Sequence, residues 1–100
     1  MNQYLYFLKP TRLGMVVEGP TPVEAEIVSR HFAHLEALTE KGVMILVGRT
    51  QNSDESTFGI AIFEAEDDST ARAIMESDPA IREGVMKAEL YPYKIALMRK

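Results

Sequence analysis

The two histidines of the sequence, His31 and His34, lie three residues apart in the segment "SRHFAHLEALTEKG" at residues 29–42. An imidazole titrates near neutral pH, so either one could accept a proton and return it within a catalytic cycle. On a helical wheel, His34 falls at the margin of the apolar arc, where it could face a cleft. His31 falls further inside that arc. From the residues alone, we favour a partly exposed helix histidine bonded locally at His34, and a general acid/base role facing a cleft is the alternative.

His31 has two interpretations. It is either a second, substrate-binding group of the same pocket or a histidine at the edge of the core with one nitrogen hydrogen-bonded. The two rings differ by about 60° around the helix axis, and no carboxylate stands at a matching ligand position. We therefore expect no metal site, and the sequence predicts no cofactor.

Other charged residues offer weaker signals. Arg12 follows the first expected strand and could bind an anionic substrate group through two parallel hydrogen bonds. Arg30 and Arg49 carry weaker versions of the same hypothesis, and a solvated arginine is the alternative for each. Asp78 precedes Pro79, and this pair predicts an N-cap for a short helical turn.

Composition narrows the class of protein. The chain has 100 residues, of which 46% are hydrophobic, and we expect one globular domain over residues 1–100. Its net charge of −4, without clustered Lys or Arg, argues against nucleic-acid binding. The absence of cysteine excludes thiolate catalysis and disulfides. No apolar run is long enough to cross a membrane and no secretory signal is visible, so we expect a cytoplasmic protein.

The apolar patterns predict strands at residues 3–9, 43–49, 57–65 and 85–99, the last with a bend or bulge at Pro92. They predict helices at residues 21–42 and 67–77, a helical turn at 78–84 and a loop at 11–20. The first helix has the clearest signals. Thr21 and Glu24 form a capping box, Pro22 suits the first helical position, and Gly42 suits the end of the helix. Its apolar face is expected to include Val28, Phe32, Leu35 and Leu38.

The resulting order is β-α-β-β-α-β, which is an α+β, ferredoxin-like arrangement with both helices on one face of an antiparallel sheet. The strand segments "YLYFL" and "VMILV" are apolar in both alternating phases. Two helices cover one face only, so the other face needs a second apolar layer. We therefore expect a homodimer that packs sheet against sheet.

Two longer segments resemble a known family. "RHFAHLEALTEKGVMILVGR" spaces Arg30, His34, Leu38 and Gly42 by four residues, and "SDPAIREGVMKAELYPYKIAL" begins with the Asp78-Pro79 pair. Together they resemble the YciI-related (YCII) family of small dimeric α+β barrel proteins, over nearly the whole chain. The resemblance implies a pocket near the sheet and first helix, and a His–Asp pair whose members map to His34 and Asp78. The long segment "RLGMVVEGP" departs from many members, so the pocket could differ in shape.

From the residues and the resemblance together, we expect a small enzyme in which His34 acts as general acid/base and Asp78 orients it. The substrate would be a small organic molecule, and lyase, isomerase and hydrolase chemistry all stay open. A non-catalytic ligand-binding or assembly module with the same dimeric fold is the main alternative. A haem-handling dimeric barrel is a third.

Overall fold

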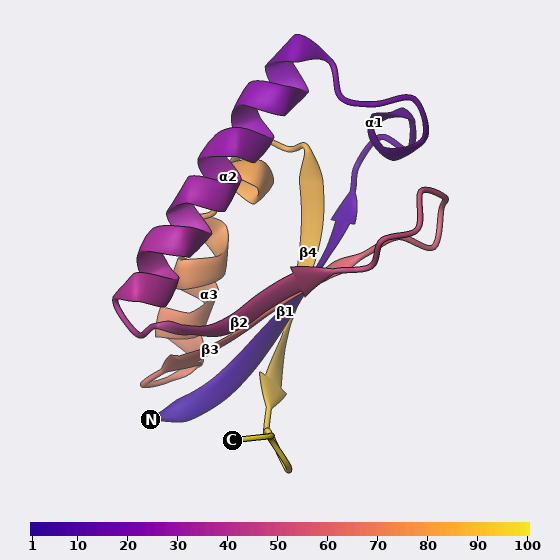
Figure 1. Ribbon diagram of the computed structural model, residues 1–100. Coiled ribbons are helices and arrows are strands. Elements are labelled where there is room, and N and C mark those ends of the chain that lie inside the picture. Colours follow the sequence, from indigo (N-terminus) through magenta and orange to yellow (C-terminus); the bar gives the residue numbers. More distant parts are fainter.

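Four antiparallel strands form one sheet, and the two longer helices cover one of its faces (Figure 1). The computed structural model describes residues 1–100, and the strand order is β2-β3-β1-β4. This arrangement confirms the expected α+β, ferredoxin-like fold. The strands are β1 (Asn2–Pro10), β2 (Met44–Arg49), β3 (Gly59–Ala65) and β4 (Met86–Tyr93), and the helices are α1 (Gly14–Val17), α2 (Pro22–Glu40), α3 (Asp68–Glu76) and α4 (Pro79–Arg82).

The start of α2 is fixed by the expected capping box. The Thr21 hydroxyl accepts from the Glu24 amide at 3.2 Å, and the Glu24 carboxylate accepts from the Thr21 amide at 2.9 Å. Pro22 occupies the first turn. Gly42 follows the helix with a φ of 80°, a conformation that glycine adopts without strain, and turns the chain into β2.

One stripe of α2 faces the sheet, and its members are four residues apart. Ile27 and Leu35 are 5% and 3% exposed, and His31 lies between them on the same stripe. Phe32 was expected on this face, but it is 66% exposed, because the helix buries the 27-31-35 stripe instead. Beneath α2 and α3, the core contains side chains of β1 and β3, chiefly Tyr4, Tyr6, Leu8, Ala61 and Phe63.

Two expected boundaries were wrong. The segment 11–20, expected as a loop, contains the single-turn helix α1. The last strand ends at Tyr93, because Tyr93 pairs with Gln3 and β1 has only one residue left beyond it. The amide of Ile95 then bonds to the Gln3 side chain at 2.8 Å. Pro92 lies within the ladder, as an edge strand permits, and the register shift lies in β2 instead.

The sheet face turned away from the helices is apolar. In the pairing register, the central residues of this face are Leu5 paired with Ile62 and Phe7 paired with Ile60. Leu46 of β2 lies beside Ile62 and is 42% exposed. No helix of the chain packs on this face (Figure 1). None of the helices combines the length and apolar character needed to cross a bilayer.

The ion pair between Arg12 and Glu24 should make stability depend on pH in acid. Hydrogen bonds from Arg12, and then from the Thr21 amide, lower the pKa of Glu24 from about 4.5 to about 2. A lowered carboxylate pKa contributes stability that is complete above the unfolded pKa and disappears as the pH falls through the folded one. In urea unfolding, the free energy of unfolding of wild type should therefore exceed that of Glu24→Gln. This difference should be constant above about pH 5 and shrink towards pH 2.

Glu36→Gln is the matched control, because Glu36 is exposed on the same helix and makes no ion pair. At neutral pH, Glu36→Gln should lower the free energy of unfolding by less than Glu24→Gln does. Equal losses in the two variants at pH 7 would contradict a role of the Arg12 pair in stability.

Candidate active site

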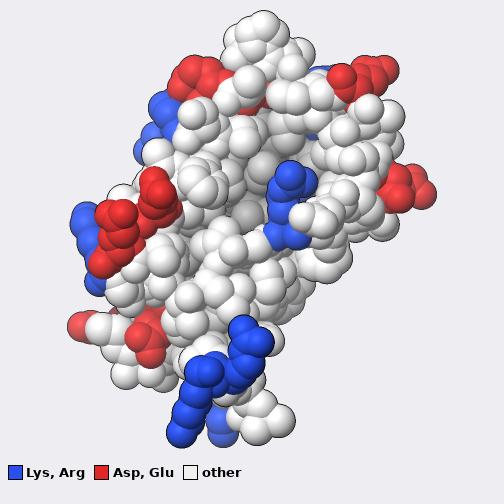
Figure 2. Space-filling model, viewed as in Figure 1, with Lys and Arg blue, Asp and Glu red and all other residues white.

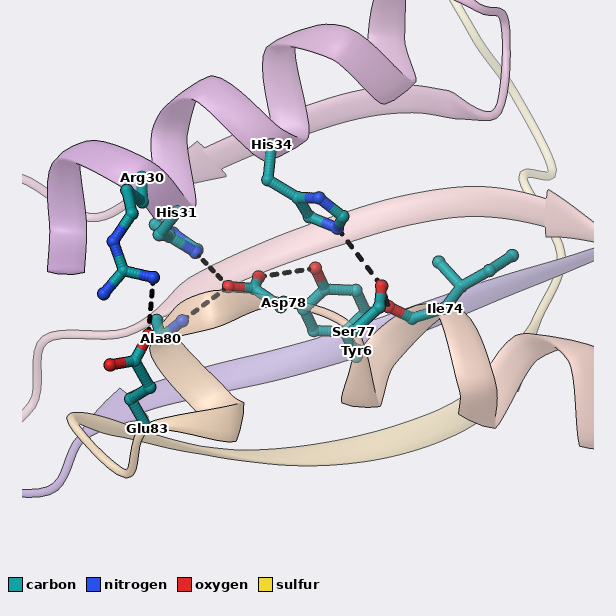
Figure 3. Close-up of polar contacts among 9 residues, drawn as sticks. All are labelled: Tyr6, Arg30, His31, His34, Ile74, Ser77, Asp78, Ala80 and Glu83. Atoms are coloured by element: carbon teal, nitrogen blue, oxygen red, sulfur yellow. Dashed lines mark hydrogen bonds and ion pairs between the residues drawn. The ribbon is translucent and has the colours of Figure 1, made fainter.

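Asp78 is the centre of a buried polar cluster between α2, β1 and α4 (Figure 3). Its side chain is fully buried and accepts the Tyr6 hydroxyl at 2.9 Å through Oδ2 and the Ala80 amide at 2.9 Å through Oδ1. The Ala80 contact makes Asp78 the N-cap of α4, as the sequence predicts. Three contacts, counting the histidine described next, satisfy a carboxylate that would otherwise be costly to bury.

The histidine that reaches Asp78 is His31. Its Nδ1 lies 2.6 Å from Asp78 Oδ1, and its side chain is 12% exposed. The expected pairing of His34 with Asp78 was wrong, because the 27-31-35 stripe of α2 faces the sheet and carries His31 over α4. The reading of His31 as a core-edge histidine with one bonded nitrogen fits this contact. An ionised carboxylate only accepts, so Nδ1 donates and the neutral ring keeps a lone pair on Nε2.

His34 contacts the neighbouring Ser77 instead (Figure 3), with 3.2 Å between Nε2 and the serine Oγ. The Ser77 hydroxyl donates its proton to the Ile74 carbonyl at 2.6 Å. Since a hydroxyl has one proton, its oxygen must accept from His34 Nε2–H. The two histidines of α2 therefore hold their protons on opposite nitrogens.

This difference is a prediction that NMR can test without a substrate. At a pH where both rings are neutral, the ¹⁵N shifts of His31 should identify the Nδ1–H tautomer and those of His34 the Nε2–H tautomer. Ser77→Ala removes the acceptor of His34 and should change the shifts of His34 alone. The same tautomer at both positions would contradict the assigned contacts.

Tyr6 is a member of the cluster that sequence reasoning missed. Its side chain is 0% exposed, and its only hydroxyl partner is Asp78. Burial, then the charge of Asp78 and their hydrogen bond, raise the pKa of the Tyr6 phenol, so it remains a donor at physiological pH. A buried tyrosine needs a hydroxyl partner, and that need was the available signal.

A second contact joins the same two helices beside the cluster (Figure 3). Arg30, next to His31, binds Glu83 at 2.5 Å just beyond the end of α4 and Glu26 at 2.6 Å on its own helix. All three side chains are partly exposed, so the direct contribution to stability is modest. The contact holds α2 in register with the turn that carries Asp78. Arg30 therefore has a structural role and does not contact the cavity.

A cavity of about 530 Å³ opens beside His31, between α2, the α1 segment and the strand ends of β1 to β3. This volume is within the range of about 300–1,000 Å³ that is usual for small-molecule sites. His31 lines the cavity and His34 does not. His31 Nε2 has no partner in the chain and is not enclosed, so it is accessible from the cavity. Figure 2 shows the hollowed face as largely uncharged, with a basic group beside the hollow.

Arg12, expected to bind substrate, does not line this cavity. Its Nη2 and Nε both donate to the Glu24 carboxylate, at 2.6 and 2.9 Å. These contacts hold the α1 segment against the start of α2. The arginine that lines the cavity is Arg49, at the end of β2. Sequence reasoning gave it only a minor place, because its position depends on the pairing of β2 with β3.

The family model of the YCII-related domain matches residues 4–94 of this chain. The chain belongs to the YCII-related family. The match includes every residue of the Asp78 cluster and all of the sheet except Asn2 and Gln3 at the start of β1. No curated protein matches the chain significantly in sequence.

Two solved structures share the fold of this YCII-related protein. One is the 5-chloro-2-hydroxyhydroquinone dehydrochlorinase TftG from Burkholderia phenoliruptrix AC1100, in complex with 2,5-dihydroxybenzoquinone. It has 24% identity, a TM-score of 0.67, and coverage of 92% of this chain and 93% of that one. The other is the uncharacterized protein TM1266 from Thermotoga maritima, with 13% identity, a TM-score of 0.56, and coverage of 92% and 95%. At these identities the likeness establishes the fold.

Proposed function

We propose that this YCII-related protein is an enzyme in which His31, oriented by Asp78, acts as general acid/base on a small organic molecule. The observation that carries the proposal is the 2.6 Å contact from Nδ1 to Asp78 on a ring that lines the cavity. This arrangement fixes the ring and stabilises the imidazolium that forms when Nε2 takes a proton.

The surrounding contacts support repeated proton transfer at one place. Tyr6 and the Ala80 amide hold Asp78, so the carboxylate does not need to move when His31 changes charge. Nε2 can take a proton from a C–H or O–H group of the substrate and return it to the product. Elimination and isomerisation need this shuttle, and hydrolysis would also need room for an attacking water.

The dehydrochlorinase of similar fold provides a starting reaction. We propose testing loss of HCl from 5-chloro-2-hydroxyhydroquinone, in which a base removes a proton and the C–Cl bond breaks to release chloride. The purified protein should release chloride faster than the uncatalysed reaction, and Asp78→Asn should reduce the rate while the protein stays folded. Release at the uncatalysed rate for this compound and for a panel of related small phenols would favour the alternative, a ligand-binding module with the same fold.

We further propose that the protein works as a homodimer packed through the apolar sheet face. Leu5, Phe7 and Ile60 are partly exposed in the centre of that face, beside the buried Ile62, and together they form an apolar surface. Burying such a surface between two copies would add stability that a 100-residue chain gains only in part from its own core.

Leu46→Glu tests this dimer. Leu46 is 42% exposed at the edge of the apolar face, and a twofold interface would bury two unpaired carboxylates. We expect the dimer Kd to rise at least about a hundredfold in sedimentation velocity. Val47→Glu is the matched control, because Val47 is 39% exposed but lines the cavity on the opposite face. A monomeric wild type, or equal effects of the two variants, would contradict the proposed interface.

A further inference from the structure

The charge of the cavity is unusually simple. Of the 17 residues that line it, Arg49 is the only one with a permanent charge, and His31 is the only other ionisable group. No Asp or Glu lines the cavity, although the chain as a whole carries a net charge of −4. Arg49 is therefore the one permanent charge that a ligand in the cavity meets at its walls, and its sign is opposite to the net charge of the chain.

Arg49 is also available to a ligand. Arg12 and Arg30 are both engaged by glutamates within the chain, at 2.5–2.6 Å. Arg49 makes no ion pair, and its side chain donates no hydrogen bond to the protein. A guanidinium presents five donors in a fixed fork that matches a carboxylate or another anionic oxygen. The guanidinium N–H groups of Arg49, at the cavity wall, are therefore free to donate to a ligand.

The strand pairing brings the stem of Arg49 close to the cavity wall. Arg49 pairs with Gly59 of β3, and a Cβ at Gly59 would lie 3.2 Å from the Gly48 carbonyl oxygen and 3.6 Å from Arg49 Cβ. The bare backbone of Gly59 thus leaves room along this wall, and Gly48 and Gly59 both line the cavity.

The remaining walls favour a flat apolar body. Phe32 of α2 lines the cavity and is 66% exposed. The apolar side chains of Val28, Val47 and Met86 line it as well. An exposed aromatic ring at an apolar cavity wall provides surface on which a planar ligand can pack.

Building on the proposed function, we infer that Arg49 is the specificity-determining residue of the cavity and that the substrate is a small planar molecule bearing an anionic oxygen, such as a carboxylate or phenolate. Arg49 binds the anion while the ring of the ligand packs against Phe32. His31 faces the same cavity and acts on the bound molecule. Neutral analogues of the same shape lack the charge-assisted hydrogen bonds and bind less tightly.

Benzoate and benzamide are suitable probes, because they share a planar ring and differ in charge. Binding is followed by ¹H–¹⁵N NMR titration of the purified protein at pH 8. Benzoate should shift the resonances of cavity residues and bind more tightly than benzamide. Arg49→Gln should weaken benzoate binding at least about tenfold and leave benzamide binding within about twofold. Arg49→Lys should retain part of the benzoate affinity, because the charge remains without the fork.

Arg72→Gln is the matched control. Arg72 is exposed on α3, so the substitution removes the same charge at a position that does not line the cavity. Its benzoate affinity should stay within about twofold of wild type. Equal benzoate affinities of wild type and Arg49→Gln, or equal losses in Arg49→Gln and Arg72→Gln, would overturn the inference. Turnover combined with Arg49-independent binding refutes this inference only. Arg49-dependent binding without turnover in any assay refutes the proposed enzyme and leaves the anion site standing.

Discussion

Replacing Asp78 with alanine should lower the free energy of unfolding by about 3–5 kcal/mol, the cost of opening a buried polar cluster. The substitution leaves the buried Tyr6 hydroxyl and the Ala80 amide without a partner and removes the N-cap of α4. It also frees His31 Nδ1, which α2 holds against the same carboxylate. Equilibrium urea unfolding, followed by circular dichroism, measures this loss.

Asp67→Ala is the matched control, because Asp67 caps α3 through the Thr70 amide at 2.8 Å but is exposed and has no partner outside Thr70. Its loss should be about 1 kcal/mol, the usual value of an N-cap. Similar losses at the two positions would show that Asp78 acts only as a cap. Tyr6→Phe in the Asp78→Ala background should then cost less than in wild type, because the hydroxyl has already lost its partner.

The features that sequence reasoning predicted well are those fixed by neighbouring residues. The capping box of Thr21 and Glu24 and the cap of Asp78 each depend on side chains within three positions, so their signals are complete in the sequence. The fold class follows in the same way from the order of the elements. The apolar outer face was also predicted, because β1 is apolar in both phases and only one layer of helices exists.

The pairing at the site depended on information that is not local. A helical wheel ranks residues by distance from the apolar arc, and it placed His34 at a margin suited to a cleft. The cavity is lined by Val28, His31 and Phe32 of α2 and by no residue of α3, and α2 extends past α3 (Figure 1), so the ring inside the arc faces the cavity. His31 is four residues from both Ile27 and Leu35, and this spacing was the signal for the buried stripe. Which stripe sits over Asp78 is set by the packing of α2 on α4.

The same reasoning explains why Arg49 lines the cavity, although Arg12 was the arginine expected to bind substrate. Arg12 is near the first strand in sequence, but its guanidinium is bound by Glu24 on the adjoining helix. Arg49 reaches the cavity only because β2 pairs with β3 and ends opposite Gly59. Strand pairing joins residues that are distant in sequence, so a pattern within one strand cannot locate its end in the tertiary structure.

Substitution of His31 should have the largest effect on activity. In the assay proposed above, His31→Asn should lower the rate of chloride release from 5-chloro-2-hydroxyhydroquinone by on the order of 10²–10⁴, the usual contribution of a general acid/base. Asparagine carries its amide nitrogen on Cγ, as histidine carries Nδ1, so it can still donate a hydrogen bond to Asp78 and the protein stays folded. The change therefore removes the titrating nitrogen at the cavity with little cost in stability, and both are measured on the same preparation.

His34→Gln is the matched control on the same helix, since His34 bonds to Ser77 and does not line the cavity. Its rate should remain within a few-fold of wild type, because the substitution leaves the contact from His31 to Asp78 in place. Loss of activity in His34→Gln with retention in His31→Asn would return the catalytic role to His34, as the family resemblance implied. Each variant replaces an imidazole with an amide whose nitrogen takes the place of the ring nitrogen that makes the contact. Their comparison therefore separates proton transfer at the cavity from any general effect on α2.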